Sequence, residues 1–217
     1  MKYTLITGAS SGIGLKLSYI FAKNNHNLIL VARSKDILSI LKDNLQSLYN
    51  IDIKIISLDI SGEKKAFNLY ETIKKKQLKV DILINNAGIG SHGEFIKKNI
   101  QTSLDMINLN IITPTILTKL FLQDMLEAGS GKIFNIASTA AFQSGPLMSV
   151  YYGTKSYLLN FSEGIAEELR DRNIKIVTLC PGPTKTHFEK MDRIEKKFLK
   201  NFHIANPEDI ARYLYKN

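Results

Sequence analysis

The feature that most constrains this chain is a regular alternation of short apolar segments with longer segments of helical periodicity. The apolar segments, rich in Ile, Leu and Val, are 3–7, 27–32, 54–59, 81–86, 132–138 and 175–180, and the clearest helical segments are 12–23, 100–127 and 150–172. Strands that are apolar on both faces belong in a parallel sheet covered by helices on both sides. The alternation therefore predicts a doubly wound α/β fold in three layers, α/β/α, with six parallel strands in a single domain over residues 1–217.

The composition narrows the class of protein. A chain of 217 residues with 44% hydrophobic residues can bury a substantial core. Its one cysteine, Cys180, allows no disulfide within the chain. No signal-peptide pattern precedes the first apolar segment, and no apolar run is long enough to span a bilayer. We therefore expect a cytoplasmic protein with no membrane partner.

The net charge of +9 leaves two interpretations open. It is compatible with binding to nucleic acid, or with lysines scattered over solvated helix faces. The lysines are spread along the chain without a basic tail, so we expect no nucleic-acid partner. A positive field would also favour a strongly anionic small cofactor. The four histidines show no paired spacing of metal ligands, so we expect no metal.

The segment after the first apolar run, "TGASSGIG", opens a predicted helix and carries Gly8, Gly12 and Gly14. Glycine allows a tight turn and lets a phosphate approach the backbone N–H groups at a helix N-terminus. The spacing G-x-x-x-G-x-G differs from the common dinucleotide and P-loop fingerprints. Its position between a strand and a helix nevertheless indicates a phosphate-binding loop.

The ends of the second and third apolar segments carry charged residues. The second segment ends in Ala32 and Arg33, where an acidic residue would hold the ribose 2′-hydroxyl of NAD. Arg33 instead suits a 2′-phosphate, and the alternative is a surface arginine in a turn. Asp59 is either a partner for an adenine amino group or an N-terminal acid of the following helix.

The later segment ends carry amide, hydroxyl and phenol groups. After the fourth segment, "NNAG" can tie loops to the sheet through its amides, and its Ala87 and Gly88 leave room for a flat ligand. After the fifth comes Ser138, followed by Tyr151 and Lys155 at helical i, i+4 spacing, which places both on one helix face. Tyr152 is a competitor for Tyr151, and helix packing alone is the alternative for both. "PGPTKT" follows the sixth segment as a rigid turn.

These motifs stand in the order and at the separations found in the short-chain dehydrogenase/reductase family, which the chain resembles over about residues 2–215. The resemblance implies a Rossmann-type fold and a catalytic set of Asn, Ser, Tyr and Lys. Ser138, Tyr151 and Lys155 match three of these positions. Asn110, in "INLNIITP", is the best match for the asparagine, with Asn108 as a competitor.

The resemblance also implies a bound dinucleotide. The residues expected to hold it are Gly8, Ser10, Ser11, Gly12, Ile13, Gly14, Arg33, Asp59, Ile60, Asn86, Ala87, Gly88, Tyr151, Lys155, Pro181, Gly182, Thr184 and Thr186. Arg33 predicts a preference for NADP(H) over NAD(H). Ser11, however, stands where many NADP-dependent members of the family carry a basic residue.

The activity implied by the family is the interconversion of a carbonyl and a secondary alcohol by hydride transfer. Tyr151 is then the acid–base group, and the cation of Lys155 is expected to lower its pKa. Ser138 is expected to donate a hydrogen bond to the developing oxyanion, and Asn110 to hold a water that links Lys155 to solvent. The alternative is a non-catalytic dinucleotide-binding protein with a regulatory role.

The family resemblance also guides the reading of the C-terminal part. The resemblance implies a lid over a small-molecule substrate at about 184–206. The apolar residues among charges there favour a substrate with an apolar part, with plain helix packing as the alternative. Family members usually carry a seventh strand, for which this chain has no counterpart. We expect a homodimer built on the helices that follow the fourth and fifth strands.

Overall fold

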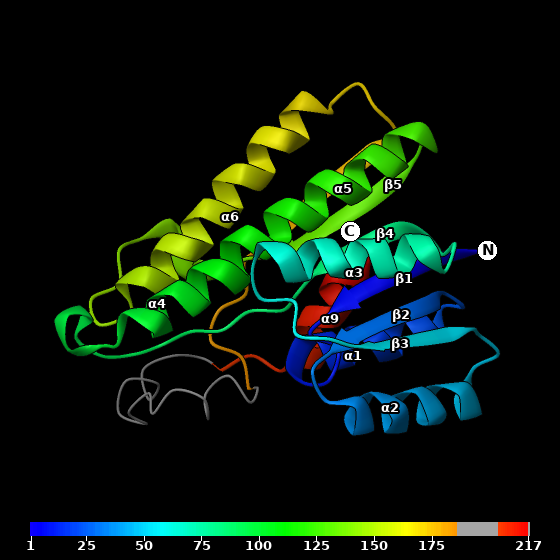
Figure 1. The fold of residues 1–217 in the computed structure, drawn as a ribbon, viewed down its shortest axis with the longest axis horizontal. Helices are drawn as coiled ribbons and strands as arrows, with labels where there is room; N and C mark the ends of the chain where they lie inside the picture. The colour runs from blue at the N-terminus through cyan, green and yellow to red at the C-terminus, as the bar shows by residue number, and fades with distance from the viewer. Residues whose placement is uncertain (186–203, 217) are drawn as a thin grey trace.

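In the computed structural model of the chain, which describes residues 1–185 and 204–216, one parallel sheet carries six strands (Figure 1). The strands are β1 (Lys2–Thr7), β2 (Asn27–Ala32), β3 (Ile53–Ser57), β4 (Lys79–Asn85), β5 (Gly131–Ile136) and β6 (Ile174–Leu179). Their order across the sheet is β3-β2-β1-β4-β5-β6, and every neighbouring pair is parallel. The predicted Rossmann-type α/β fold with six strands is confirmed.

Helices cover both faces of this sheet (Figure 1). On one face lie α1 (Gly12–Lys23), α2 (Lys35–Leu48) and α9 (Pro207–Lys216), and on the other α3 (Glu63–Lys75), α5 (Thr113–Glu127) and α6 (Ser149–Glu168). Side chains alternate between the faces along each strand. In β2, Leu28 and Leu30 pack with the first group of helices, while Ile29 and Val31 pack with the second. Both faces are buried, which explains the continuous apolar runs in the sequence.

The segment 100–127, predicted to be helical, is helical throughout and has three parts. They are α4 (Ile100–Ile107), a five-residue π-helix (Asn108–Ile112) and α5. Pro114 stands in the first turn of α5 and has no N–H to donate to the preceding turn. The hydroxyl of Thr113 lies 2.9 Å from the Asn108 carbonyl oxygen and 2.6 Å from that of Ile60. The prediction of helical structure over 100–127 is confirmed, and these two residues accompany the change from α-helical to π-helical hydrogen bonding at Asn108–Ile112.

Two short 3₁₀ helices, Phe95–Lys97 and Thr139–Phe142, follow β4 and β5. The first lies in the connection to α4, and the second in the connection to α6. Both connections leave the carboxyl ends of the strands, where ligands bind in open α/β sheets. The order of the strands reverses between the neighbours β1 and β4, so the crevice is expected there.

The C-terminal part returns to the carboxyl ends of the strands, where it pairs with the segment after β6. Ala205 donates its N–H to the Pro183 carbonyl at 2.8 Å and accepts one from Lys185 at 3.0 Å. The predicted lid at 184–206 falls largely on residues 186–203, which lie outside the described residues. Among the helices of the described residues, none has the length and apolar character needed to cross a membrane.

Candidate active site

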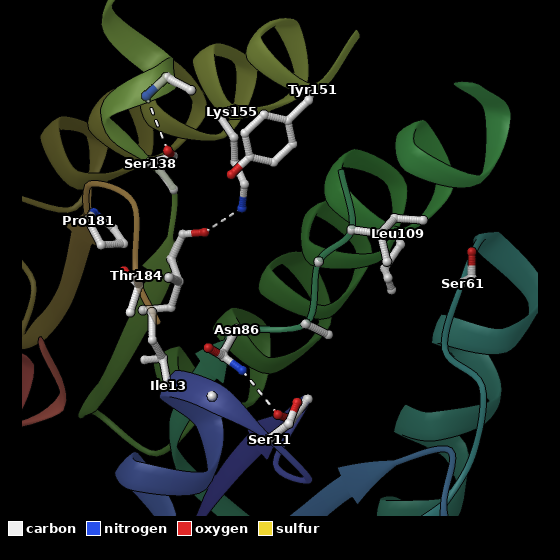
Figure 2. A pocket seen from close by; sticks show the side chains of 18 of the residues that line it. Ser11, Ile13, Ser61, Asn86, Leu109, Ser138, Tyr151, Lys155, Pro181 and Thr184 are labelled. Carbon is white, nitrogen blue, oxygen red and sulfur yellow. Dashed lines mark hydrogen bonds between the residues drawn. The ribbon is translucent and has the colours of Figure 1, made fainter. Parts of the chain in front are cut away.

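A cavity of about 550 Å³ lies at the carboxyl ends of the strands (Figure 2). Most of the residues predicted to bind a cofactor or a substrate line it. They are Gly8, Ser10, Ser11, Gly12, Ile13, Arg33, Asp59, Ile60, Asn86, Ala87, Gly88, Ser138, Tyr151, Lys155, Pro181, Gly182 and Thr184. The tertiary structure therefore brings together segments that are spread over most of the chain.

Two of the predicted residues do not line the cavity. Gly14 is buried against the backbone of Gly8 and the amide of Asn86, where a Cβ would collide with both, so it packs the loop rather than lining the cavity. Asn110 is 2% exposed and lies behind Ile89. Thr186 lies outside the described residues.

Asn86 holds the glycine-rich loop against β4. Its side-chain amide donates to the carbonyl oxygens of Thr7 at 2.9 Å and Gly8 at 3.3 Å, and its backbone N–H donates to the Thr7 hydroxyl at 3.0 Å. The preceding Asn85 points the other way, into the core, where it donates to Thr118 and Asn135. The two asparagines thus have different tasks, one for the loop and one for the packing of the sheet.

Ser138, Tyr151 and Lys155 gather at one end of the cavity, with Ser11 and Ile13 at the other (Figure 2). Ser138 lies two residues beyond β5 and its Oγ accepts a hydrogen bond from the Ala140 N–H at 3.1 Å. Lys155 is buried and its Nζ donates to the Ile136 carbonyl at 2.8 Å. The end of β5 and the first half of α6 therefore position three polar groups together.

The two ionisable groups of this cluster have shifted pKa values. Burial lowers the pKa of Lys155 to about 8, because the charged ammonium loses its hydration. Burial also raises the pKa of the Tyr151 phenol, while a hydrogen bond with Ser138 acts in the opposite direction. The prediction that the pKa of Tyr151 is lowered is wrong for this structure, since burial of the phenol has the largest effect.

Tyr151 and Tyr152 both line the cavity, but they have different neighbours. The Tyr151 ring centre is 5.9 Å from the Lys155 ammonium, one helical turn away. The Tyr152 ring packs directly over Gly145, where a Cβ would collide with it. Of the two tyrosines, Tyr151 is therefore the one whose ring lies near the Lys155 ammonium, as the predicted i, i+4 spacing requires.

Asn110 and Asn108 occupy different environments. The Asn110 amide donates to the Ile89 carbonyl at 2.8 Å and to the Thr154 hydroxyl at 3.0 Å, and it accepts the Ile89 N–H at 3.0 Å. A Cβ built on Gly88 would lie 3.2 Å from Asn110 Oδ1 and 3.5 Å from Lys155 Nζ. The side chain of Asn108 faces Gly62 instead. Of the two competitors, Asn110 is therefore the one beside Lys155.

At the opposite end, the cavity is lined by charged side chains that follow β2 and β3. Ala32 pairs with Ser57 in the sheet, so Arg33 and Asp59 leave neighbouring strand ends. Lys65, in the first turn of α3, also lines the cavity and forms an ion pair with Asp59. Sequence reasoning missed Lys65 because it considered strand ends alone. Its position six residues after Asp59, at a helix start, was the available signal.

The residues present fit a dinucleotide. Ser11 is the N-cap of α1 and makes no side-chain cap, so a bound phosphate can take the N–H groups of the first turn. A Cβ built on Gly182 would meet no atom within 4 Å, and this residue lines the cavity near Ser138 and Lys155. Among the described residues, no three possible metal ligands come together.

Known proteins resemble this chain in sequence. The family described as short chain dehydrogenase matches residues 2–197. The "NADP-dependent 3-hydroxy acid dehydrogenase" of Schizosaccharomyces pombe is 33% identical, over 98% of this chain and 85% of that protein. The "Very-long-chain 3-oxoacyl-CoA reductase" of Anas platyrhynchos is 31% identical, over 97% of this chain and 66% of that protein.

A solved structure extends the comparison to the fold. The short-chain dehydrogenase from Sphingobium yanoikuyae in complex with NADPH superimposes with a TM-score of 0.92 and 27% sequence identity. The match covers 100% of this chain and 84% of that protein. The two chains therefore share one fold.

Proposed function

The chain belongs to the short-chain dehydrogenase family, and from that premise we propose that it is an NADP(H)-dependent oxidoreductase that interconverts a ketone and a secondary alcohol. The observation that carries the proposal is the convergence of Ser138, Tyr151 and Lys155 at one end of a cavity that can hold a dinucleotide. These three side chains can stabilise an oxyanion, move a proton and supply a positive charge.

The cofactor would be held along the strand ends. The loop from Gly8 to Ile13 and the N-terminus of α1 would bind its pyrophosphate, and Arg33 would bind the 2′-phosphate. Lys155 would bind the ribose next to the nicotinamide, and the segments after β4 and β6 would hold the nicotinamide. When bound, the nicotinamide supplies the hydride for carbonyl reduction or accepts it in alcohol oxidation.

The chain's own residues handle the oxygen and its proton. Ser138 donates a hydrogen bond to the carbonyl oxygen, and the Tyr151 phenol transfers its proton to that oxygen. The raised pKa of Tyr151 keeps the proton on the phenol at neutral pH, which suits the reduction direction. The Lys155 ammonium favours the phenolate that forms after the transfer. Asn110 links Ile89 to Thr154, the residue before Lys155, and the water relay predicted for it remains a prediction.

The proposed substrate class rests on the residues that line the cavity near Ser138 and Tyr151, and on the names of the similar proteins. Ala140, Gln143, Met148 and Tyr152 line the cavity beside Ser138 and Tyr151, which gives a largely apolar wall. The names of the two curated relatives both describe a carbonyl or hydroxyl at position three of an acyl chain. We therefore propose that the substrate is a 3-oxo acid or its thioester with an apolar chain.

The test is a turnover assay with NADPH and a panel of ketones that includes 3-oxo acids, 3-oxoacyl thioesters and simple ketones. The expected result is loss of NADPH absorbance with at least one 3-oxo substrate, and a rate about 10²–10⁴-fold lower with Tyr151→Phe. Binding of NADPH without turnover of any ketone or alcohol would favour the non-catalytic alternative. The cytoplasmic location and the homodimer are independent predictions that this assay does not address.

A further inference from the structure

The end of the cavity where Arg33 is proposed to bind the 2′-phosphate also contains a carboxylate, Asp59. Its negative charge would repel that phosphate. Asp59 lines the cavity in the turn after β3, close to Arg33 in the turn after β2. Its Oδ1 accepts the Ser61 N–H at 3.0 Å, which holds the carboxylate in place. A carboxylate near a phosphate dianion repels it, which is why an acid after the second strand favours NAD over NADP in related folds. In this chain the acid stands after the third strand instead.

The charge of this carboxylate is offset from α3. Lys65 forms an ion pair with Asp59 Oδ2, and both side chains line the cavity together with Arg33. Although partial burial acts in the opposite direction, the hydrogen bond from Lys65 and the nearby charge of Arg33 lower the pKa of Asp59. Asp59 is therefore ionised at neutral pH. The pair contributes almost no net charge, and the Arg33 cation is left to dominate this end of the cavity.

We propose that Lys65 is a determinant of selectivity for NADPH over NADH, and that it acts by neutralising Asp59 beside the 2′-phosphate. The inference rests on the proposed NADP(H) function and deepens it. The position at which many family members carry a second basic residue is occupied here by Ser11, and Lys65 compensates from α3. Lys65 is a positioning residue, because its effect on the cofactor passes through Asp59.

The test measures the dissociation constants of NADPH and NADH by cofactor fluorescence, without substrate. The variants are Lys65→Gln, Lys65→Arg, Asp59→Asn and the double variant Lys65→Gln/Asp59→Asn. Lys64→Gln is the matched control, because Lys64 is the exposed neighbour on the same helix and does not line the cavity. Water weakens charge interactions at this half-exposed pair, so we expect Lys65→Gln to weaken NADPH about three- to tenfold and to leave NADH unchanged.

The other variants identify the route of the effect. Lys65→Arg keeps the wild-type preference, and the double variant recovers NADPH affinity to within about twofold of Asp59→Asn alone. An equal loss for both cofactors in Lys65→Gln would overturn the proposal, because it would indicate a loss of local packing. A loss that persists in full in the double variant would also overturn it, since Lys65 would then act directly on the phosphate. Equal affinity of the wild type for both cofactors would instead contradict the underlying NADP(H) preference.

Discussion

The rings of Tyr151 and Tyr152 meet edge to face, with their centres 6.2 Å apart and their planes at 76°. Neighbouring residues on a helix point about 100° apart, so the two phenols have different partners although both line the cavity. Lys155 stands one turn beyond Tyr151, whereas Tyr152 covers Gly145. This geometry favours Tyr151 as the acid–base group and indicates that Tyr152 only lines the cavity.

The first prediction separates these two roles by removing one hydroxyl at a time. Tyr151→Phe is expected to keep NADPH binding and to lose about 10²–10⁴-fold in kcat, the usual size of a general acid–base contribution. Tyr152→Phe is the matched control and is expected to stay active. The measurements are steady-state kinetics and cofactor fluorescence on both variants. An inactive Tyr152→Phe beside an active Tyr151→Phe would show that the assigned register is wrong.

The second prediction concerns the cost of burying Lys155. Its pKa is lowered from 10.5 to about 8, so between these pH values the unfolded chain binds more protons than the folded one. The free energy of unfolding therefore rises with pH over this window, and below about pH 8 the buried charge costs about 3 kcal/mol. Lys155→Met removes this cost and also the hydrogen bond to Ile136, so we expect a gain of about 2 kcal/mol at neutral pH together with loss of activity.

Urea unfolding of wild type and Lys155→Met at several pH values checks this second prediction. The extra free energy of unfolding of Lys155→Met is expected to shrink as the pH approaches the reference pKa of lysine, because the wild type then no longer buries a charged ammonium. A Lys155→Met protein that is less stable than the wild type at neutral pH would contradict the prediction. It would mean that the contacts of the ammonium outweigh its desolvation.

The third prediction concerns the cofactor phosphate. Arg33 lines the cavity next to the end of β2, and a hydrogen bond to a charged group contributes about 1.5–3 kcal/mol. We expect the wild type to prefer NADPH by roughly ten- to hundredfold in kcat/KM, towards the lower value because Ser11 adds no charge. Arg33→Ala is expected to weaken NADPH and barely to change NADH. Equal kcat/KM values for the two cofactors in the wild type, or a parallel loss in Arg33→Ala, would remove Arg33 from the phosphate site.

The fourth prediction concerns assembly. We expect a homodimer through the helices after β4 and β5. Tyr157 of α6 fits such a surface, because it is 37% exposed, stacks on Phe161 and lies 3.0 Å from the Thr115 hydroxyl of α5. Tyr157→Glu is expected to shift sedimentation velocity towards monomer at micromolar concentration. Tyr213→Glu, on α9 at the opposite face of the sheet, is the control and is expected to leave the dimer intact. A stable wild-type tetramer would contradict this prediction.

The fold could be predicted because its signal is local and repeated. Each strand has five to seven residues and is rich in apolar ones, and the helices carry apolar residues three or four apart, such as Leu38, Leu41 and Leu45 of α2. Such patterns depend on neighbouring residues alone. The π-helical turn at Asn108–Ile112 was not predicted, because it involves Thr113, whose hydroxyl also reaches Ile60 some fifty positions earlier.

The amino-acid sequence by itself determined the six parallel strands, the family and the list of residues at the strand ends, because these follow from periodicity and from spacing along the chain. Only the tertiary structure decided which groups meet and how they ionise. In the folded chain Asn110, and not Asn108, lies near Lys155, and Lys65 pairs with Asp59. Burial raises the pKa of Tyr151, whereas a lowered pKa was expected from the sequence. The physical reason is that burial and charge pairing depend on distances in space, between groups that lie far apart in the chain or on different turns of a helix.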